Sequence, residues 1–286
     1  MMSGISGSVA LVTGSSEGIG LSAARAYAAA GARVALTART ASRLHQEVAS
    51  LVAGGADALA VPADVTSPDD VARLMHEVRE RWGGLDILVC NAGVGLFGSI
   101  ETLSEPALRQ AFEVNFFGVV RCIQQALPLM RPRRRGLIQI VSSVIGRRSL
   151  PMYGGYCATK FALHAVADAL RLELEPDGIQ VQMFYPALTD TRFSRNALVS
   201  SPRTGSGRIR ATSADEVARQ MVAAARRRKR DHVVTAGGRA LVRLNDLAPG
   251  LVDAILGQVM MRPGGRTKDP LDALSRRREQ PRRRGA

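Results

Sequence analysis

The sequence predicts an α/β fold in which a doubly wound, mostly parallel β-sheet is flanked by helices within a single domain. Short β-branched runs alternate with longer stretches whose apolar residues recur at helical spacing, which is typical of parallel strands joined by crossover helices. Several strand-like runs, such as residues 137–141, are apolar at nearly every position, which fits a sheet covered on both faces. With 286 residues, of which 46% are hydrophobic, the chain can bury one large core.

The individual elements follow from the same alternation. We expect strands at residues 9–13, 33–38, 58–61, 87–90, 137–142, 180–185 and 232–235. We expect helices at residues 19–30, 42–53, 68–82, 104–130 and 155–175, and another that begins near Ala214. Doubly wound sheets bind ligands beyond the carboxyl ends of their strands. The functional residues should therefore follow the strands directly.

The formal net charge of +14 is partly a property of the C-terminal segment. Residues 262–286 hold nine Arg or Lys and three Asp or Glu, so this segment alone carries +6. Two further basic clusters, Arg133–Arg135 and Arg226–Arg230, follow predicted helices, where cations complement the helix dipole. A protein that binds single-stranded nucleic acid would need aromatic residues interleaved with such clusters, and neither cluster has them. We expect no nucleic-acid partner.

Composition also bears on the cellular compartment. No run approaches the roughly 18 apolar residues of a membrane-spanning helix, and residues 1–8 lack a signal-peptide pattern. Cys90, Cys122 and Cys157 are widely spaced, without histidines at metal-ligand intervals. We expect a cytoplasmic protein with reduced thiols, no transmembrane segment and no metal site.

A glycine-rich turn follows the first predicted strand and opens the first predicted helix. Its glycines are Gly14, Gly18 and Gly20. Such a turn lets the backbone approach a pyrophosphate, whose charge the free N–H groups and the helix dipole stabilise. The predicted fold is therefore Rossmann-like, although three residues separate the first two glycines, unlike the common G-x-G-x-x-G spacing.

A tyrosine and a lysine are spaced to cooperate on the helix predicted at residues 155–175. Tyr156 and Lys160 are four residues apart, so their side chains share one face. A nearby ammonium favours the phenolate and lowers the tyrosine pKa, as a general acid/base requires. Tyr153 has Cys157 rather than a lysine at its fourth position. For an isolated pair, a half-buried tyrosine beside a solvated lysine would be the default interpretation.

The glycine spacing resembles the T-G-x-x-x-G-x-G motif of the short-chain dehydrogenase/reductase family. Further signatures of that family follow in order and cover about residues 5–235: Asn91-Ala92-Gly93, Asn115, Ser143 and Tyr156-Cys157-Ala158-Thr159-Lys160. The chain departs from the pattern at Cys90, where asparagine is common, and at Ala187, where glycine is common. Neither change removes a reacting group.

The resemblance implies four catalytic residues. Ser143 holds the substrate oxygen, Tyr156 exchanges the proton, and Lys160 both tunes Tyr156 and holds the ribose. Of the adjacent Ser142 and Ser143, only one can face the site, and the family spacing selects Ser143. Asn115 takes a water and proton-relay role with Lys160, with a plain structural hydrogen bond as the alternative.

The resemblance also implies the cofactor-binding residues and the assembly. Asp64 and Val65 match the family's adenine contact, although Asp64 could instead cap the following helix. Relatives form homodimers or homotetramers through the helices after the fourth and fifth strands. The implied cofactor-binding set is Gly14, Ser16, Gly18, Ile19, Gly20, Arg39, Asp64, Val65, Asn91, Ala92, Gly93, Tyr156, Lys160, Pro186 and Thr191.

The end of the second strand indicates the cofactor. Arg39 stands where an acidic residue would bind the ribose hydroxyls of NAD, and an arginine can pair with the 2′-phosphate of NADP. We therefore expect NADP(H) to be preferred over NAD(H). Glu17 argues the other way, because its carboxylate occupies a loop position where many NADP-preferring relatives carry a basic residue.

The domain organisation follows from these motifs. Residues 1–238 should form the dinucleotide-binding and catalytic domain, with a polar substrate lid at about residues 189–212. Residues 239–261 should form a helical C-terminal extension, two short amphipathic helices interrupted at Pro249, that packs on the domain edge rather than on a membrane. Residues 262–286 read as a basic, disordered tail.

Together these expectations define an NAD(P)-dependent oxidoreductase. We expect reversible hydride transfer between NADP(H) and a hydrophobic ketone or secondary alcohol, with Tyr156 as general acid/base. The alternative is a catalytically silent cofactor-binding sensor or scaffold. A nucleotide-sugar epimerase is disfavoured by the glycine spacing and the short C-terminal region. The apolar residues expected near the site mouth are Leu96, Phe97, Ile145, Leu188 and Phe193.

Overall fold

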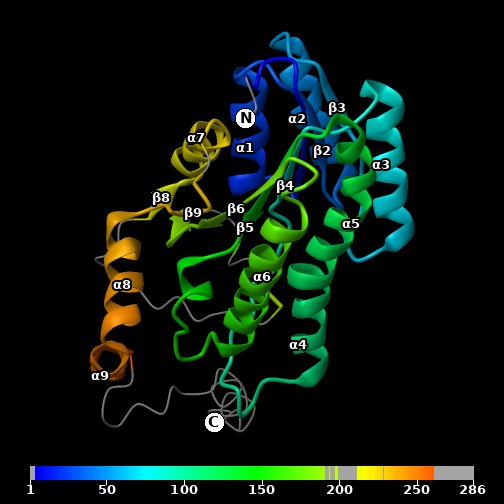
Figure 1. The fold of residues 1–286 in the computed structure, drawn as a ribbon. Coiled ribbons are helices and arrows are strands. Elements are labelled where there is room, and N and C mark those ends of the chain that lie inside the picture. Colours follow the sequence, from blue (N-terminus) through cyan, green and yellow to red (C-terminus); the bar gives the residue numbers. More distant parts are fainter. Residues whose placement is uncertain (1–3, 191–192, 194–196, 199–210, 228, 261–286) are drawn as a thin grey trace, which may run out of the picture.

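The computed structural model describes residues 4–190, 193, 197–198, 211–227 and 229–260. Its main sheet has seven parallel strands in the order β3-β2-β1-β4-β5-β6-β9 (Figure 1). The predicted doubly wound α/β fold is confirmed. The strands are β1 (Val9–Thr13), β2 (Arg33–Thr37), β3 (Ala58–Ala60), β4 (Ile87–Cys90), β5 (Gly136–Val141), β6 (Ile179–Tyr185) and β9 (Asp231–Val233).

Helices cover both faces of this sheet, and each face has its own apolar core. Residues of β1 alternate between the two cores: Val9 and Leu11 pack with α3, α5 and α6, whereas Ala10 and Val12 pack with α1, α2 and α7. This explains why the strands are apolar at nearly every position. The helices are α1 (Gly18–Ala29), α2 (Ala41–Ala53), α3 (Pro68–Trp82), α4 (Glu105–Phe112), α5 (Gly118–Met130), α6 (Gly154–Glu173), α7 (Ala214–Ala225), α8 (Ala236–Leu247) and α9 (Pro249–Met260).

The strand order reverses direction at β1, which lies between β2 and β4. The crossover from β1 leads to β2 on one side, and the chain returns from β3 to β4 on the other side of β1 (Figure 1). In doubly wound sheets this switch point opens a crevice at the carboxyl ends of the strands. The glycine-rich turn after β1 and the Asn91-Ala92-Gly93 segment after β4 meet there.

The helix predicted at residues 104–130 is interrupted in its middle. A π-helical turn, Glu113–Phe117, separates α4 from α5. The turn contains Asn115, whose side chain is fully buried. π-helical turns inside α-helices often occur at functional sites. Apolar periodicity does not reveal such a turn, because one wider turn leaves the flanking pattern helical.

A buried, ion-paired carboxylate lies at the amino end of the sheet. Asp86, just before β4, is 2% exposed, pairs with Arg133 at 3.0 Å and Arg135 at 3.2 Å, and accepts the Val9 backbone N–H at 2.9 Å. The sequence interpretation assigned this basic cluster to the dipole of the preceding helix. In the structure the two guanidinium groups have a specific buried partner instead.

Two helices follow β9 in the described part of the chain. They are α8 and α9, which meet at Ala248, and α8 begins three residues before the expected boundary. Arg148, in the loop after β5, forms an ion pair with Asp253 of α9. A two-stranded sheet of β7 (Thr189–Asp190) and β8 (Thr212–Ser213) frames the predicted lid. Most of that lid and the whole basic tail lie outside the described residues.

Within the described ranges, no helix has both the length and the hydropathy that crossing a bilayer would require.

Candidate active site

The glycine-rich turn has the backbone geometry that its sequence predicts. Gly14 and Gly18 have positive φ angles of 63° and 58°, which favour glycine. A Cβ on Gly20 would stand 2.3 Å from the Gly14 carbonyl oxygen. Ser16 and Ile19 are half-buried in the same turn. The side chain of the N-cap residue, Glu17, does not cap the start of α1, and a glycine-rich turn before a helix N-terminus is typical of diphosphate-binding sites.

Side chains from β1 and from the loop after β4 hold this turn in place. The Asn91 side-chain amide donates to the carbonyls of Thr13 and Gly14 at 3.0 and 3.1 Å. The Thr13 hydroxyl accepts the backbone N–H groups of Asn91 and Ala92, both at 3.0 Å. Ser15 is fully buried and ties the turn to Thr37 at the end of β2. Sequence reasoning missed Thr13 and Ser15, although polar residues at the end of an apolar strand were a usable signal.

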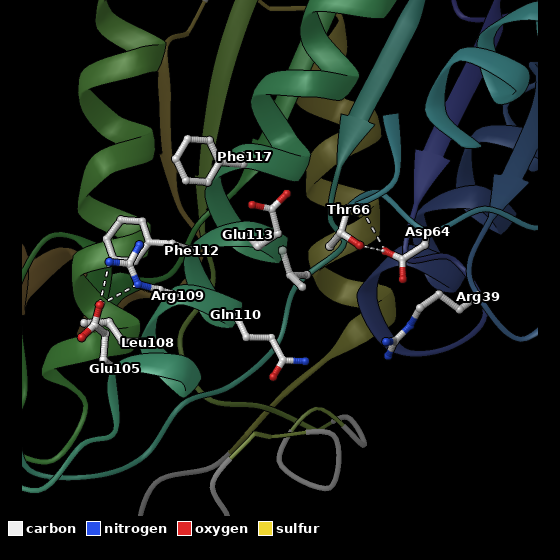
Figure 2. Close-up of a pocket in the computed structure, with 11 residues that line it drawn as sticks. Arg39, Asp64, Thr66, Glu105, Leu108, Arg109, Gln110, Phe112, Glu113 and Phe117 are labelled. Atoms are coloured by element: carbon white, nitrogen blue, oxygen red, sulfur yellow. Dashed lines mark hydrogen bonds and ion pairs between the residues drawn. The ribbon is translucent and has the colours of Figure 1, made fainter. Parts of the chain in front are cut away.

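Arg39 and Asp64 lie together on one side of a cavity of about 720 Å³, opposite residues of α4 (Figure 2). Asp64 accepts hydrogen bonds from the Thr66 backbone and hydroxyl, at 2.9 and 2.8 Å. The cap of α3 is Ser67, which accepts from the Asp70 N–H, so Asp64 shapes the turn rather than capping the helix. The neighbouring Val65 is buried. Arg39 and Asp64 are among the residues that the sequence predicts to contact the adenosine end of a dinucleotide.

Tyr156 and Lys160 share a buried face of α6, as their spacing predicts. Tyr156 is 8% exposed and forms a hydrogen bond with Ser143. Lys160 is 3% exposed, and its Nζ lies 5.8 Å from the centre of the Tyr156 ring. The same Nζ donates to the Val141 carbonyl, at the end of β5, at 3.1 Å.

Burial dominates the acid–base properties of this pair. It raises the pKa of Tyr156 well above the ordinary value, and the hydrogen bond from Ser143 offsets part of that rise. Burial also lowers the pKa of Lys160 to about 8. The sequence led us to expect a lysine that lowers the Tyr156 pKa toward neutrality. The structure differs because desolvation disfavours both charged forms.

Asn115 is held by the loop after β4. Its Oδ1 accepts the Val94 N–H at 2.8 Å, and its Nδ2 donates to the Val94 carbonyl at 2.9 Å and to the Thr159 hydroxyl at 3.1 Å. A Cβ on Gly93 would stand 3.1 Å from Asn115 Oδ1 and 3.6 Å from Lys160 Nζ. Asn115 thus forms the structural hydrogen bonds of the alternative interpretation, and the relay role stays a prediction.

The two adjacent serines face different partners. Ser142 donates to the Lys160 backbone carbonyl at 3.3 Å, while Ser143 is the partner of Tyr156. The Pro186 carbonyl, after β6, accepts the Val144 N–H at 2.9 Å and so holds the Ser143 loop against the end of the sheet. The predicted contact Thr191 lies outside the described residues.

Apolar side chains surround the Tyr156 phenol. Leu96 packs against it in a small cluster that includes Ile145 and Leu198, and the Phe193 ring meets the Tyr156 ring edge-on with centroids 5.8 Å apart. Phe97 packs on Tyr153 instead. Leu188 is 54% exposed. Three of the five residues expected at the site mouth therefore lie beside the phenol.

These features define the class of protein: a dinucleotide-binding oxidoreductase with a Ser, Tyr and Lys group at the carboxyl edge of a doubly wound sheet. The family model described as short chain dehydrogenase matches residues 8–200. The chain belongs to the short-chain dehydrogenase/reductase family, whose members act with NAD(P) on CH–OH or carbonyl groups.

Individual relatives agree with this assignment. Dehydrogenase/reductase SDR family member 7B of Bos taurus is 34% identical over 85% of this chain and 78% of its own length. The 3-ketodihydrosphingosine reductase of Bacteroides thetaiotaomicron is 34% identical over 67% and 68%.

Two solved structures share the fold. A short-chain dehydrogenase/reductase from Burkholderia phymatum in complex with NAD is 25% identical, with a TM-score of 0.80 and coverage of 87% of this chain and 96% of that one. An alcohol dehydrogenase from Thermococcus sibiricus complexed with 5-hydroxy-NADP is 29% identical, with a TM-score of 0.71 and coverage of 79% and 95%.

Proposed function

We propose that this enzyme catalyses reversible hydride transfer between NADP(H) and a hydrophobic ketone or secondary alcohol, with Tyr156 as general acid/base. The observation that carries the proposal is the buried Tyr156 phenol, hydrogen-bonded to Ser143, beside Lys160 and an apolar cluster. These residues supply a proton donor, an oxygen-binding hydroxyl and a cation within one crevice. The glycine-rich turn and Arg39 lie at the same edge of the sheet.

The roles of the side chains follow from their protonation. When bound, the reduced nicotinamide supplies a hydride to the carbonyl carbon. The Ser143 hydroxyl orients the carbonyl oxygen, and Tyr156 donates the proton to it. Its raised pKa keeps the phenol protonated at neutral pH, which suits the reduction direction. The Lys160 ammonium then stabilises the phenolate that remains.

The surroundings of Tyr156 support an apolar substrate. Tyr156 belongs to an apolar cluster with Leu96, against which Ile145 and Leu198 pack, and the Phe193 ring meets its ring edge-on. Apolar walls with a few converging polar groups are typical of small-molecule sites. The similar 3-ketodihydrosphingosine reductase is named for a keto compound. A hydrophobic ketone is therefore the substrate class that we propose.

The preference for NADP(H) rests on Arg39. Its side chain is exposed, lines the cavity beside Asp64 and forms no ion pair with any residue of the described ranges. A guanidinium in that position is available for a 2′-phosphate. The solved neighbours carry an NADP derivative in one case and NAD in the other, so the choice depends on this chain's own residues.

The decisive experiment is NADPH oxidation by Tyr156→Phe with a panel of aliphatic and aromatic ketones. We expect turnover to fall by roughly 10²- to 10⁴-fold, the usual contribution of a general acid, while NADPH affinity by nicotinamide fluorescence is kept. Tyr153→Phe, three residues away on the same segment, is the matched control and should retain activity. Full turnover in Tyr156→Phe would refute the assignment. A wild type that binds NADPH but reduces no ketone would favour the sensor or scaffold alternative.

We also propose a homodimer or homotetramer in the cytoplasm. The helices after β4 and β5 expose Phe117 (49%), Phe161 (42%) and Leu172 (73%), and large apolar side chains on a surface often mark protein contacts. Light scattering after size exclusion should give the mass of a dimer or tetramer. Phe161→Glu should shift it toward the monomer.

A further inference from the structure

Glu17 presents a difficulty for NADP(H) binding, because its carboxylate stands in the glycine-rich turn directly before Gly18. It is the N-cap residue of α1 but its side chain does not cap that helix. Instead Glu17 Oε2 lies 2.7 Å from Arg43 Nη1. The negative charge nearest to the turn is therefore paired with a cation that comes from a different element.

Arg43 reaches this position from the first turn of α2. It is the third residue of that helix, whose N-cap, Thr40, makes no side-chain capping bond, and no acidic residue lies in the first turn. A cation in the first turn opposes the helix dipole, so Arg43 is placed against local helix preference. The Glu17–Arg43 pair links the glycine-rich turn to the segment that carries Arg39.

Stability does not explain this pair. The Arg43 and Glu17 side chains are 41% and 26% exposed, and solvent-exposed ion pairs contribute about 0–1 kcal/mol. Charge placement does explain it. With Glu17 paired, Arg39 is left as a net positive charge where the glycine-rich turn meets the end of β2.

The carboxylates across the cavity follow the same pattern. Glu105 pairs with Arg109 at 2.6 Å, and Glu113 pairs with Arg121 at 2.9 Å. Asp64 accepts two hydrogen bonds from Thr66. Arg39 thus faces a cavity whose acidic side chains are each compensated or hydrogen-bonded.

We propose that Arg43 determines cofactor specificity by cancelling the charge of Glu17, so that Arg39 can bind the 2′-phosphate of NADP(H). This inference rests on the proposed NADP(H) function. A 2′-phosphate carries up to two negative charges, so the Glu17 carboxylate would repel it more strongly without Arg43, whereas NAD(H) has only hydroxyls there. Arg43 acts through Glu17 and is a positioning residue.

The test is a double-mutant cycle on the full chain, with NADPH and NADH each titrated by nicotinamide fluorescence. Arg43→Gln should weaken NADPH binding about tenfold, the size expected for one partly screened unit charge near a phosphate, and leave NADH binding nearly unchanged. Glu17→Gln alone should keep or tighten NADPH binding. Glu17→Gln combined with Arg43→Gln should restore NADPH affinity close to the wild-type value.

Arg25→Gln provides the matched control. Arg25 of α1 pairs with Glu47 of α2 at 2.5 Å, so it joins the same two helices through other residues. Arg25→Gln should change neither the NADPH affinity nor the NADH affinity. Thermal unfolding of each variant checks that the fold is kept.

The outcomes separate the inference from the function on which it rests. If the wild type prefers NADPH but Arg43→Gln weakens both cofactors equally, or the double variant binds NADPH as weakly as Arg43→Gln, charge cancellation is refuted while the NADP(H) function stands. If the wild type binds NADH more tightly or binds neither cofactor, the NADP(H) proposal fails and this inference fails with it.

Discussion

Asp86 and Lys160 are charged side chains buried at opposite ends of the same sheet, and their surroundings differ. Asp86, 2% exposed at the amino end, has two arginines and a backbone N–H as partners. Lys160, 3% exposed at the carboxyl end, has a backbone carbonyl and the face of a tyrosine ring. Its pKa falls to about 8 because burial is not offset by a carboxylate.

This difference separates a charge with a structural partner from the charge that we propose to be functional. Burying a charge is costly, and a paired counter-ion with further hydrogen bonds recovers much of that cost. At the amino end of the sheet, the partners of Asp86 offset much of its desolvation cost. At the carboxyl end, the desolvation cost of Lys160 beside Tyr156 is not offset in this way. Active sites often retain such unfavourable interactions, because chemistry needs the group in that protonation state and position. Three predictions test the comparison, from the largest expected effect to the smallest.

The largest effect should come from Asp86→Ala. Removing the carboxylate leaves Arg133 and Arg135 without their shared partner and the Val9 N–H unsatisfied, so the free energy of unfolding should fall by about 3 kcal/mol. Urea unfolding followed by circular dichroism measures it. Turnover per folded molecule should stay unchanged because the site lies at the other end of the sheet. Asp177→Ala, which breaks the more exposed Arg131–Asp177 pair, should cost less than about 1 kcal/mol, and equal losses would contradict the comparison.

Lys160→Met should instead increase the free energy of unfolding. It removes a buried charge that lacks a counter-ion, so near pH 7 the cofactor-free protein should gain on the order of 2 kcal/mol while turnover is lost. The gain depends on pH. Because the Lys160 pKa is lowered from 10.5 to about 8 when folded, the unfolded chain binds more protons between these values, and wild-type stability rises with pH there.

The readout for Lys160→Met is the difference in unfolding free energy between variant and wild type at about pH 7 and about pH 9. Taking this difference removes the contribution of thiols and phenols to the pH dependence, because those groups titrate in both proteins. The advantage of the variant should shrink at the higher pH, when the wild-type lysine is neutral. An advantage that does not change with pH would show that the lysine charge is not the source of the cost.

The smallest effect should come from Arg135→Gln. The Arg135 side chain is 61% exposed, against 29% for Arg133, so solvent screens its ion pair with Asp86. The free energy of unfolding should therefore fall by about 0.5 kcal/mol. Arg133→Gln should cost more in the same urea titration, because its guanidinium is the more buried partner. If Arg135→Gln cost more stability than Arg133→Gln, solvent exposure would not determine the relative strength of the two ion pairs.

The order of helices and strands was predictable from the sequence because it depends on local patterns. Apolar periodicity and turn residues lie within a few positions of one another, so the strands of the main sheet and most helices agree with their predicted ranges to within a few residues. The π-helical turn Glu113–Phe117 and the short strands β7 and β8 were not predicted. The glycine-rich turn and the Tyr156–Lys160 spacing were predictable for the same reason, whereas the choice of Ser143 over Ser142 came from the family resemblance. Each is a short motif whose place relative to a strand defines its position at the edge of the sheet.

Contacts between distant segments were decided by the tertiary structure alone. Glu17 and Arg43 meet across two helices, Asp86 meets its two arginines across β4 and β5, and Asn115 turns inward through a π-helical turn. The protonation of Tyr156 and Lys160 also belongs here. Their four-residue spacing indicated a mutual electrostatic effect, but the pKa of each depends on how completely the folded chain excludes water, and desolvation depends on every element packed around them.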